Sequence, residues 1–230
     1  MNIAIMQPYF FPYIGYFQLV RAVDKFVFYD DVNFIKNGWI NRNRILLNNR
    51  AAYITVQLNG ASSFKRISYV EFTDNRGKLK KAIEQAYKKA PYFNSAWAVI
   101  NDCLDLKTNL MSELAAYSVV QVSKYLVLNV LFETSSAHYL ETKNLESAER
   151  IKEICRISGA SRYINPIGGM ELYKKDDFAT AGVDLRFIKS NDIRYAQNKN
   201  EFIPWLSIID VMMFNSPEEI REMLNQYELI

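Results

Sequence analysis

Histidine and cysteine are scarce in this chain of 230 residues, which contains one histidine, His138, and two cysteines, Cys103 and Cys155. A single imidazole excludes metal sites built from several histidines and mechanisms that need two imidazoles. The cysteines lie far apart, and the apolar pattern around each one predicts a helix, so we expect buried thiols. A structural zinc site is therefore not expected, whereas the need for a divalent metal in a reaction stays open.

The sequence also lacks an apolar run near the roughly 20 residues of a membrane-spanning helix, and no signal peptide precedes its first predicted strand. We therefore expect no membrane span and a cytoplasmic protein, in which a disulfide would be unusual. Internal repeats and low-complexity segments are missing as well. No Gly-x-Ser-x-Gly nucleophile elbow occurs, although a Ser-His-Asp triad stays open.

Charge of one sign is not concentrated anywhere, because the net charge is only +3 and basic residues alternate with acidic ones. Nucleic acid is therefore not expected as a partner. With 50% hydrophobic and 23% charged residues, the chain is expected to fold and not to be disordered. Its 15 tyrosines suit binding surfaces, although packing in the core accounts for many aromatic residues.

Alternating strands and helices predict an α/β fold with a Rossmann-like open sheet. Residues 3–6 and 26–29 are short apolar runs on either side of an amphipathic segment, which predicts a βαβ unit. Further strands are expected at residues 67–72, 127–132, 162–164 and 183–188, with a hairpin over residues 45–58 that turns at Asn48 and Asn49. Helices are expected at residues 145–157, 202–214 and 217–227, the first closed by Gly159 and the last capped by Ser216.

The domain organisation is expected to be one α/β domain over residues 1–230. Three helical patterns interrupt the alternation, with Pro91 between the first two. Residues 77–127 are therefore interpreted as a helical insertion or subdomain within that domain.

Residues 7–16 follow the first strand, with the sequence Gln-Pro-Tyr-Phe-Phe-Pro-Tyr-Ile-Gly-Tyr. In open α/β sheets, ligands bind beyond the carboxyl ends of the strands, where this segment emerges. A glycine at the start of the following helix would let the backbone approach a phosphate. Packing beneath the helix explains Tyr9 about as well. The candidate binding residues here are Gln7, Tyr9, Tyr13, Gly15 and Tyr16.

Three residues are candidates for catalysis. Asp30 and Asp31 follow the second strand, where a carboxylate could hold a metal, act as a base or cap the next loop, with capping the commonest role. Adjacent carboxylates in a strand point to opposite sides, so only one of them would face a ligand. His138 ends residues 133–138, which are predicted to be a loop, and is a candidate general base.

The densest polar segment covers residues 36–44. An arginine can bind phosphate with two hydrogen bonds, and an indole can stack on a base or a sugar, although a solvated basic loop is the alternative. A second group follows the strand at residues 162–164, where glycines allow a ligand to approach the backbone or simply form a tight turn. The candidate binding residues are Lys36, Trp39, Asn41, Arg42, Arg44, Asn165, Gly168 and Gly169.

The sequence also predicts partners for two further charged residues. Arg150 lies early in its predicted helix and could point to the site, but pairing with Glu146 or Glu153 is preferred. Asp210 is surrounded by apolar neighbours, so it is expected to meet a basic residue or a buried amide.

Residues 13–16, Tyr-Ile-Gly-Tyr, stand where nucleotidyl-transferring α/β proteins and related synthetases carry a His-x-Gly-His signature. Phenols stay protonated near neutral pH and cannot become the cations that stabilise a pentavalent phosphorus. The resemblance therefore implies a nucleotidyltransferase-like fold and a nucleotide-binding helix start, without nucleotidyl transfer.

The sequence as a whole resembles the WbqC-like family, at residues 6–17, 29–32, 39–43, 158–169 and 206–210. This resemblance implies a bacterial origin and a role in the synthesis of O-antigen, the lipopolysaccharide side chain, or of another surface polysaccharide. The ligand is then expected to be a nucleotide-linked sugar of the dTDP or UDP type.

The implied reaction is N-acyl or aminoacyl transfer to an amino sugar, which makes the protein a transferase, with the donor and any cofactor left open. The alternative is a non-catalytic protein that binds or assembles sugar nucleotides through a degenerate nucleotidyltransferase-like site. Transfer from an aminoacyl-tRNA is a third reading, and the weak positive charge counts against it.

Overall fold

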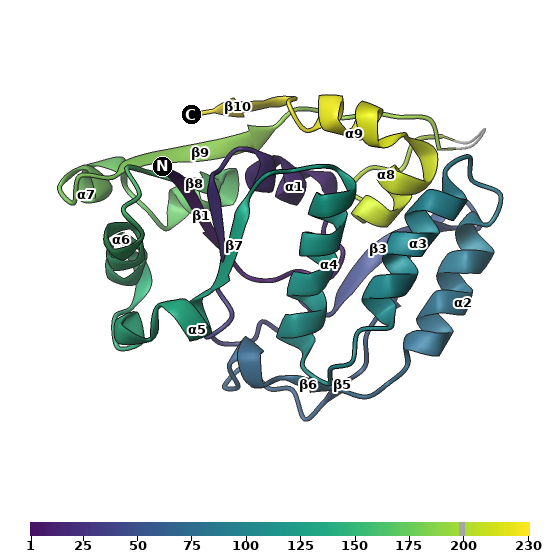
Figure 1. Cartoon of the computed structure of the whole chain (residues 1–230), viewed down its shortest axis with the longest axis horizontal. Helices are drawn as coiled ribbons and strands as arrows, with labels where there is room; N and C mark the ends of the chain where they lie inside the picture. The colour runs from purple at the N-terminus through teal and green to yellow at the C-terminus, as the bar shows by residue number, and fades with distance from the viewer. Residues whose placement is uncertain (198–200) are drawn as a thin grey trace.

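The computed structural model describes residues 1–197 and 201–230 and contains a six-stranded sheet with helices on both faces (Figure 1). The strand order is β10-β9-β8-β1-β2-β7, and neighbouring strands run parallel except at the edge, where β10 is antiparallel to β9. This arrangement is a Rossmann-like α/β fold, as the sequence predicts. The strands are β1 (Asn2–Met6), β2 (Lys25–Phe28), β7 (Leu131–Thr134), β8 (Arg162–Pro166), β9 (Asp184–Ser190) and β10 (Tyr227–Leu229).

Outside this sheet lie the helices and four shorter strands. The antiparallel pairs are β3 (Arg42–Leu47) with β4 (Arg50–Thr55), and β5 (Leu58–Asn59) with β6 (Glu71–Phe72). The α-helices of the described residues are α1 (Ile14–Arg21), α2 (Arg76–Tyr87), α3 (Phe93–Leu104), α4 (Met111–Tyr125), α5 (Ser135–His138), α6 (Ser147–Ser158), α7 (Lys175–Ala179), α8 (Ile208–Phe214) and α9 (Pro217–Met223). Short 3₁₀ helices cover Ile67–Tyr69, Leu140–Thr142 and Ile167–Glu171.

Successive residues of β1 enter two different cores. Ala4 packs into the larger core, which holds apolar residues of α1, α4 and α8. Ile3 and Ile5 pack into the smaller core, with Ile154 of α6 and Phe178 of α7. Because side chains alternate along a strand, a sheet covered on both faces needs strands that are apolar throughout. This explains why β1 is a continuous apolar run and not an alternating one.

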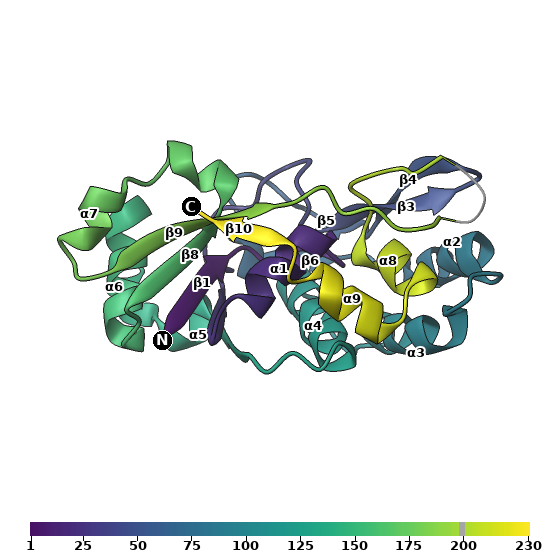
Figure 2. The same ribbon diagram turned by 90° about the horizontal axis from the view of Figure 1, so that it is seen from above.

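A long connection separates β2 from its neighbour β7. It contains the β3–β4 hairpin and helices α2, α3 and α4, with α3 packed against α4 and α8. The hairpin lies at the end of the molecule opposite α6 and α7 (Figure 2). The predicted insertion at residues 77–127 contains most of α2 and all of α3 and α4, and its standing as a separate unit stays a prediction.

The position of β1 decides where a ligand can bind. From β1 the chain passes through α1 to β2 on one side, whereas β8, on the other side of β1, comes much later in the chain. The direction of strand addition therefore reverses between β1 and β8. In open α/β sheets a crevice forms beyond the carboxyl ends of the strands at such a switch point.

Local signals predicted several turns and caps correctly. Asn48 and Asn49 both have positive φ angles, 51° and 60°, as a tight hairpin turn requires. Gly159 ends α6 in the left-handed conformation, with φ 66°. Ser216 caps α9 together with Glu219 in a reciprocal capping box.

Two predictions around β7 were wrong. Residues 127–130 are not in a strand, because Val127 has a φ of 54° and β7 begins only at Leu131. The predicted loop at residues 133–138 instead completes β7 and then forms α5. An apolar run does not show where pairing with a neighbouring strand starts, and here that neighbour is β2.

Three more predicted elements differ from the structure. Residues 67–69 form a 3₁₀ helix, which leaves only Glu71–Phe72 as a strand. Residues 202–207 are not helical, and α8 begins at Ile208. The last helix ends at Met223, because Tyr227 pairs with Ser190 in the sheet. Such pairings join residues far apart in sequence, so local periodicity cannot reveal them.

A buried carboxyl group joins the hairpin, the helices and the segment before α8. The Tyr87 hydroxyl donates to Oδ1 of Asp210 (2.7 Å), and the Tyr195 hydroxyl (2.7 Å) and Gln197 Nε2 (2.8 Å) donate to Oδ2. The Tyr87 hydroxyl also accepts a hydrogen bond from the backbone of Leu46 in β3 (2.8 Å). The expected buried amide partner of Asp210 is thus Gln197, and all three of these partners are neutral.

We predict that Asp210 makes the stability of the protein fall as pH rises. Burial raises the pKa of the Asp210 carboxyl, so the unfolded chain, in which its pKa is about 3.9, loses the proton first. Above that pH the free energy of unfolding should decrease relative to Asp210→Asn, by at most about 1.4 kcal/mol per pH unit, until the folded carboxyl also ionises. Urea unfolding between pH 4 and 8 measures this difference. The exposed Asp176→Asn is the matched control, and a pH-independent difference for Asp210→Asn would contradict the prediction.

Candidate functional site

A hollow of about 350 Å³ lies beyond the carboxyl ends of β1, β2 and β8, at the switch point of the sheet. We call it the strand-end crevice. Its walls come from four parts of the chain that meet only in the folded protein. The lining residues are Ile5, Met6, Gln7, Tyr9, Tyr29, Ile35, Ile151, Tyr163, Asn165, Pro166, Gly168, Gly169, Leu172 and Tyr173.

The polar side chains that line the strand-end crevice are two amides and four tyrosines. The side-chain oxygen of Gln7 is buried and has no hydrogen-bond partner in the described part of the chain. A Cβ on Gly169 would overlap the side-chain amide of Asn165, so this glycine makes room for a neighbouring side chain. A Cβ on Gly168 would meet no atom within 4 Å, which leaves the backbone open to a ligand. The structure thus brings Gln7 and Tyr9 together with Asn165 near the end of β8 and with Gly168 and Gly169 just after it.

A second hollow, of about 300 Å³, adjoins the first, because Tyr9 lines both. We call it the aromatic pocket. Arg44 lies over the Trp39 ring, 5.8 Å from its centroid, and its Nη2 donates to the Trp205 carbonyl (2.9 Å). The Tyr13 ring meets the Trp205 ring edge-on at 5.9 Å. Its lining is Tyr9, Pro12, Tyr13, Trp39, Asn43, Arg44 and Trp205.

The segment that lines both hollows is held by distant side chains. Asn43 Nδ2 donates to the carbonyls of Phe10 (3.2 Å) and Phe11 (2.9 Å), and Ser207 Oγ donates to the Phe11 carbonyl (2.6 Å). The Phe11 backbone donates in turn to Ser118 Oγ (3.1 Å). Phe11 has a φ of 41°, unusual for an aromatic residue, and these contacts from β3, α4 and the cap of α8 fix it.

The start of α1 is covered by an aromatic ring. A Cβ on Gly15 would overlap the Tyr13 ring, so packing alone explains this glycine, and a phosphate contact there stays a prediction. The Tyr16 hydroxyl is buried and donates to the Gln7 carbonyl (2.8 Å). Burial and the nearby Tyr13 raise the pKa of Tyr9 to about 12, and burial also raises the pKa of Tyr13 and Tyr16. The three phenols therefore stay neutral near pH 7.

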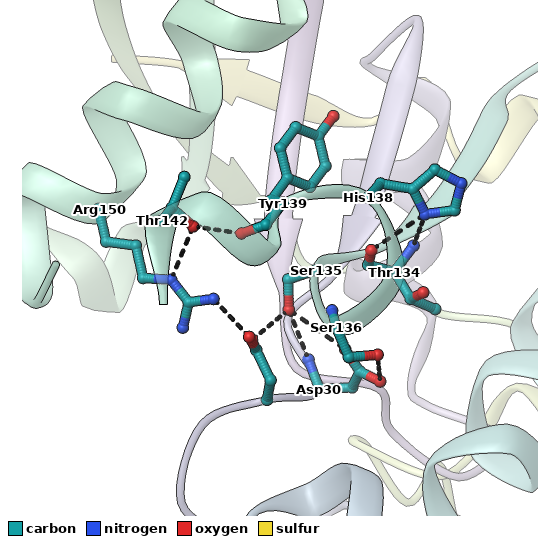
Figure 3. A network of polar contacts seen from close by, with 9 residues as sticks. Asp30, Thr134, Ser135, Ser136, His138, Tyr139, Thr142 and Arg150 are labelled. Carbon is teal, nitrogen blue, oxygen red and sulfur yellow. Dashed lines mark hydrogen bonds and ion pairs between the residues drawn. The ribbon is translucent and has the colours of Figure 1, made fainter. Parts of the chain in front are cut away.

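Asp30 and Asp31 lie just past the end of β2, and both contact Ser135. Figure 3 shows Asp30 beside Ser135 and Ser136. The Ser135 hydroxyl has one proton and lies closer to Asp31 Oδ1 (2.5 Å) than to Asp30 Oδ1 (3.2 Å). Asp30 accepts instead from the backbone (3.0 Å) and the hydroxyl (2.7 Å) of Ser136, so it caps α5. The expectation that the two carboxylates face opposite sides was wrong, because these residues have left the strand.

Arg150 completes this network. It is 4% exposed, and its Nη2 donates to Asp31 Oδ2 (2.5 Å) while its Nε donates to Thr142 Oγ1 (3.1 Å). The preferred pairing with Glu146 or Glu153 was therefore wrong, since Glu153 pairs with the exposed Arg156. The guanidinium also lies 4.9 Å from the centroid of the Tyr29 ring, which lines the strand-end crevice. All four carboxylate oxygens of Asp30 and Asp31 thus have partners.

His138 lies apart from the two carboxylates. Its ring is exposed and turns toward Thr134, away from Asp30 (Figure 3). It lines another hollow, of about 400 Å³, together with Tyr117 and Glu133. The structure therefore brings two of the three catalytic candidates together and places the third elsewhere, and their catalytic role stays a prediction.

The polar segment at residues 36–44 divides between two places. Trp39 and Arg44 line the aromatic pocket, whereas Lys36, Asn41 and Arg42 line a separate hollow of about 290 Å³. Arg42 donates to the carbonyls of residues 37 and 38 and lies over the Tyr53 ring at 4.7 Å. The sequence reasoning chose all five residues as one group, which the fold separates.

Several lining residues were missed as site candidates, among them Tyr29, Asn43 and Trp205. Trp205 gave a signal, because it follows a proline in an apolar stretch, but that stretch was interpreted as helix. In the structure Trp205 is 63% exposed and has a φ of 61°. No local pattern could have placed it opposite Tyr13.

Three general properties of the described residues bear on the chemistry. No group of three or more histidine, cysteine, aspartate or glutamate side chains is placed to hold a metal ion among them. Both cysteines are free and buried, and burial raises the pKa of Cys155 to about 12, so this thiol is unreactive near pH 7. No helix within the described ranges is both long enough and apolar enough to cross a membrane.

Comparisons with known proteins agree with the resemblance seen in the sequence. A model of the WbqC-like protein family matches residues 7–222. The chain is 27% identical over 229 residues to uncharacterized protein Rv1507c of Mycobacterium tuberculosis, and the match covers 97% of each chain. No solved structure matches the chain.

We predict that Arg150→Met destabilises the protein by about 3–5 kcal/mol, because it leaves the buried Asp31 carboxylate without its cation. Adding Asp31→Asn should recover part of this loss, since the charge is then removed as well. The control is Arg156→Met in the same helix, whose ion pair with Glu153 is exposed to solvent and should contribute little to stability. Urea unfolding followed by circular dichroism gives all three values, and equal losses for Arg150→Met and Arg156→Met would contradict the prediction.

Proposed function

The chain belongs to the WbqC-like protein family, and from this membership and its two adjoining hollows we propose that it binds a nucleotide-linked amino sugar. The proposed reaction is transfer of an acyl or aminoacyl group to the amine of that sugar. The proposed setting is the synthesis of O-antigen or another bacterial surface polysaccharide, in the cytoplasm, with a sugar nucleotide of the UDP or dTDP type.

One observation carries the proposal: the strand-end crevice and the aromatic pocket share a wall residue, Tyr9. A sugar nucleotide is elongated and combines a planar base, a charged diphosphate and a polar ring. Aromatic side chains suit the faces of bases and sugars, and an arginine suits a phosphate. The two hollows offer these groups side by side, at the position where α/β sheets bind ligands.

N-acylation requires the protein mainly to hold the amine of the sugar next to the carbonyl carbon of the donor. The amine nitrogen forms a bond to the carbonyl carbon of the donor, the bond from that carbon to its leaving group breaks, and the amine loses one proton to the leaving group or to water. The Gln7 amide oxygen can accept a hydrogen bond from the amine and orient it. Holding amine and carbonyl together supplies most of the rate enhancement in such a scheme.

A second function, binding without catalysis, is favoured by a specific observation. Each carboxylate oxygen of Asp30 and Asp31 is already bonded within the protein, and His138 lines a different hollow. A general base must reach the proton that it removes. In this alternative the protein binds or delivers the sugar nucleotide and another protein performs the transfer.

Calorimetry with UDP-glucosamine and a panel of other UDP- and dTDP-linked amino sugars tests the proposal. We expect at least one member to bind, and to bind more tightly than the matched hydroxyl sugar, such as UDP-glucose. No heat with any member would exclude both functions.

A mass-spectrometric assay then separates transfer from passive binding. The protein, the bound amino sugar nucleotide and a panel of acyl-coenzyme A and aminoacyl donors are incubated together. Transfer predicts that the sugar nucleotide gains the mass of the acyl group minus one hydrogen, only with the protein present. Binding without any such gain would favour the non-catalytic function.

A further inference from the structure

We propose that the aromatic pocket is the nucleotide subsite, with Trp205 stacking on the base and Arg44 contacting the phosphates, and that the strand-end crevice is the sugar subsite, with Gln7 contacting the sugar. This inference rests on the proposed function and adds the direction in which the ligand lies. It also assigns Trp205, which was not a site candidate from the sequence, to ligand binding.

The two hollows differ in the kind of group they leave without a partner. In the aromatic pocket the buried group is a donor, Nε of Arg44, whereas in the strand-end crevice it is an acceptor, the side-chain oxygen of Gln7. Buried polar groups are normally hydrogen-bonded, and a ligand atom of complementary kind would satisfy each of these two. A phosphate supplies acceptors only, and a sugar hydroxyl or amine supplies donors.

The charges of the two hollows support the same orientation of the ligand. None of the described residues that line the strand-end crevice is charged, and the nearby Arg150 is paired with Asp31 behind the Tyr29 ring. A diphosphate placed there would lose its water without gaining a cation. Arg44 in the aromatic pocket makes no ion pair with a carboxylate of the described residues, and its tyrosine neighbours are neutral, so an anion is favoured there.

Trp205 is exposed, yet it is held in place. Its carbonyl accepts from Arg44 Nη2 (2.9 Å), its ring meets Tyr13, and its backbone keeps a left-handed φ of 61°. Such a conformation is costly for a large residue and occurs often at ligand sites. An indole fixed at the edge of a pocket offers a stacking face to a nucleobase.

The proposed orientation of the ligand differs from the usual one in such folds, in which the phosphate binds the backbone at the start of the first helix. The Tyr13 ring covers that position above Gly15. The same ring forms a wall of the aromatic pocket. The charged part of the ligand is therefore moved from the helix start to the guanidinium of Arg44 in β3.

Calorimetry with two probes, UDP and UDP-glucosamine, tests which hollow binds the nucleotide and which binds the sugar. For UDP we expect Trp205→Ala and Arg44→Met each to weaken binding about tenfold, as loss of one stacking or phosphate contact does. Gln7→Leu should leave UDP binding unchanged and remove the extra affinity of UDP-glucosamine over UDP. Trp205→Phe, which keeps an aromatic face, should restore most of the UDP affinity.

Matched controls separate binding from folding. Phe64→Ala removes an aromatic ring that is 92% exposed, and Arg50→Met removes an exposed cation from the same hairpin, so neither should alter binding. Thermal unfolding of every variant shows whether it is folded. Gln7→Leu should not lower the melting temperature, because it deletes a buried acceptor that has no partner.

The possible outcomes are distinct. If Gln7→Leu weakens UDP binding while Trp205→Ala and Arg44→Met do not, the direction is reversed and the inference is wrong, although the proposed function stands. If UDP binds as expected but the amine of UDP-glucosamine adds nothing, the nucleotide subsite stands and the amino-sugar function fails. If the wild-type protein binds neither probe nor their dTDP analogues, both fail.

Discussion

The hydrogen bonds to the backbone of Phe10 and Phe11 are the constraint on which the rest of the site depends. Both residues are fully buried, backbone included, so their carbonyls need partners inside the protein. Those partners are Asn43 and Ser207, which lie at the ends of β3 and α8. One short segment therefore sets the distance between the hairpin, the sheet and the C-terminal helices, and both hollows lie along it.

A second network ties the sheet to the helices beside it without touching the hollows. Asp30 and Asp31 join the end of β2 to α5 and α6 through Ser135, Ser136 and Arg150. Its contribution to the site is indirect, because Arg150 stacks behind Tyr29 and so supports one wall of the strand-end crevice. Asp30 and Asp31 thus bond to the helices beside the sheet, whereas the strand-end crevice is lined by amides, tyrosines and apolar residues.

Particular residues show how far sequence reasoning reached. It chose Gln7 and Asn165 as candidate binding residues because each follows a predicted strand, and the structure has both in the strand-end crevice. This worked because the carboxyl ends of parallel strands share one edge of a sheet. It failed for Arg150, whose partner Asp31 is 119 residues away, and for Trp205, whose neighbour Tyr13 belongs to the opposite end of the chain. Pairs so distant leave no periodic signal.

By itself the sequence determined the fold class, the apolar strands, the hairpin turn and the caps at Gly159 and Ser216, because each depends on residues within one turn or one pleat of each other. The tertiary structure alone decided the strand order, the covering of the α1 start by Tyr13, and the separation of Arg42 from Arg44 into different hollows. These features depend on which buried surfaces pack together. That choice minimises the free energy of the whole chain and not of any segment.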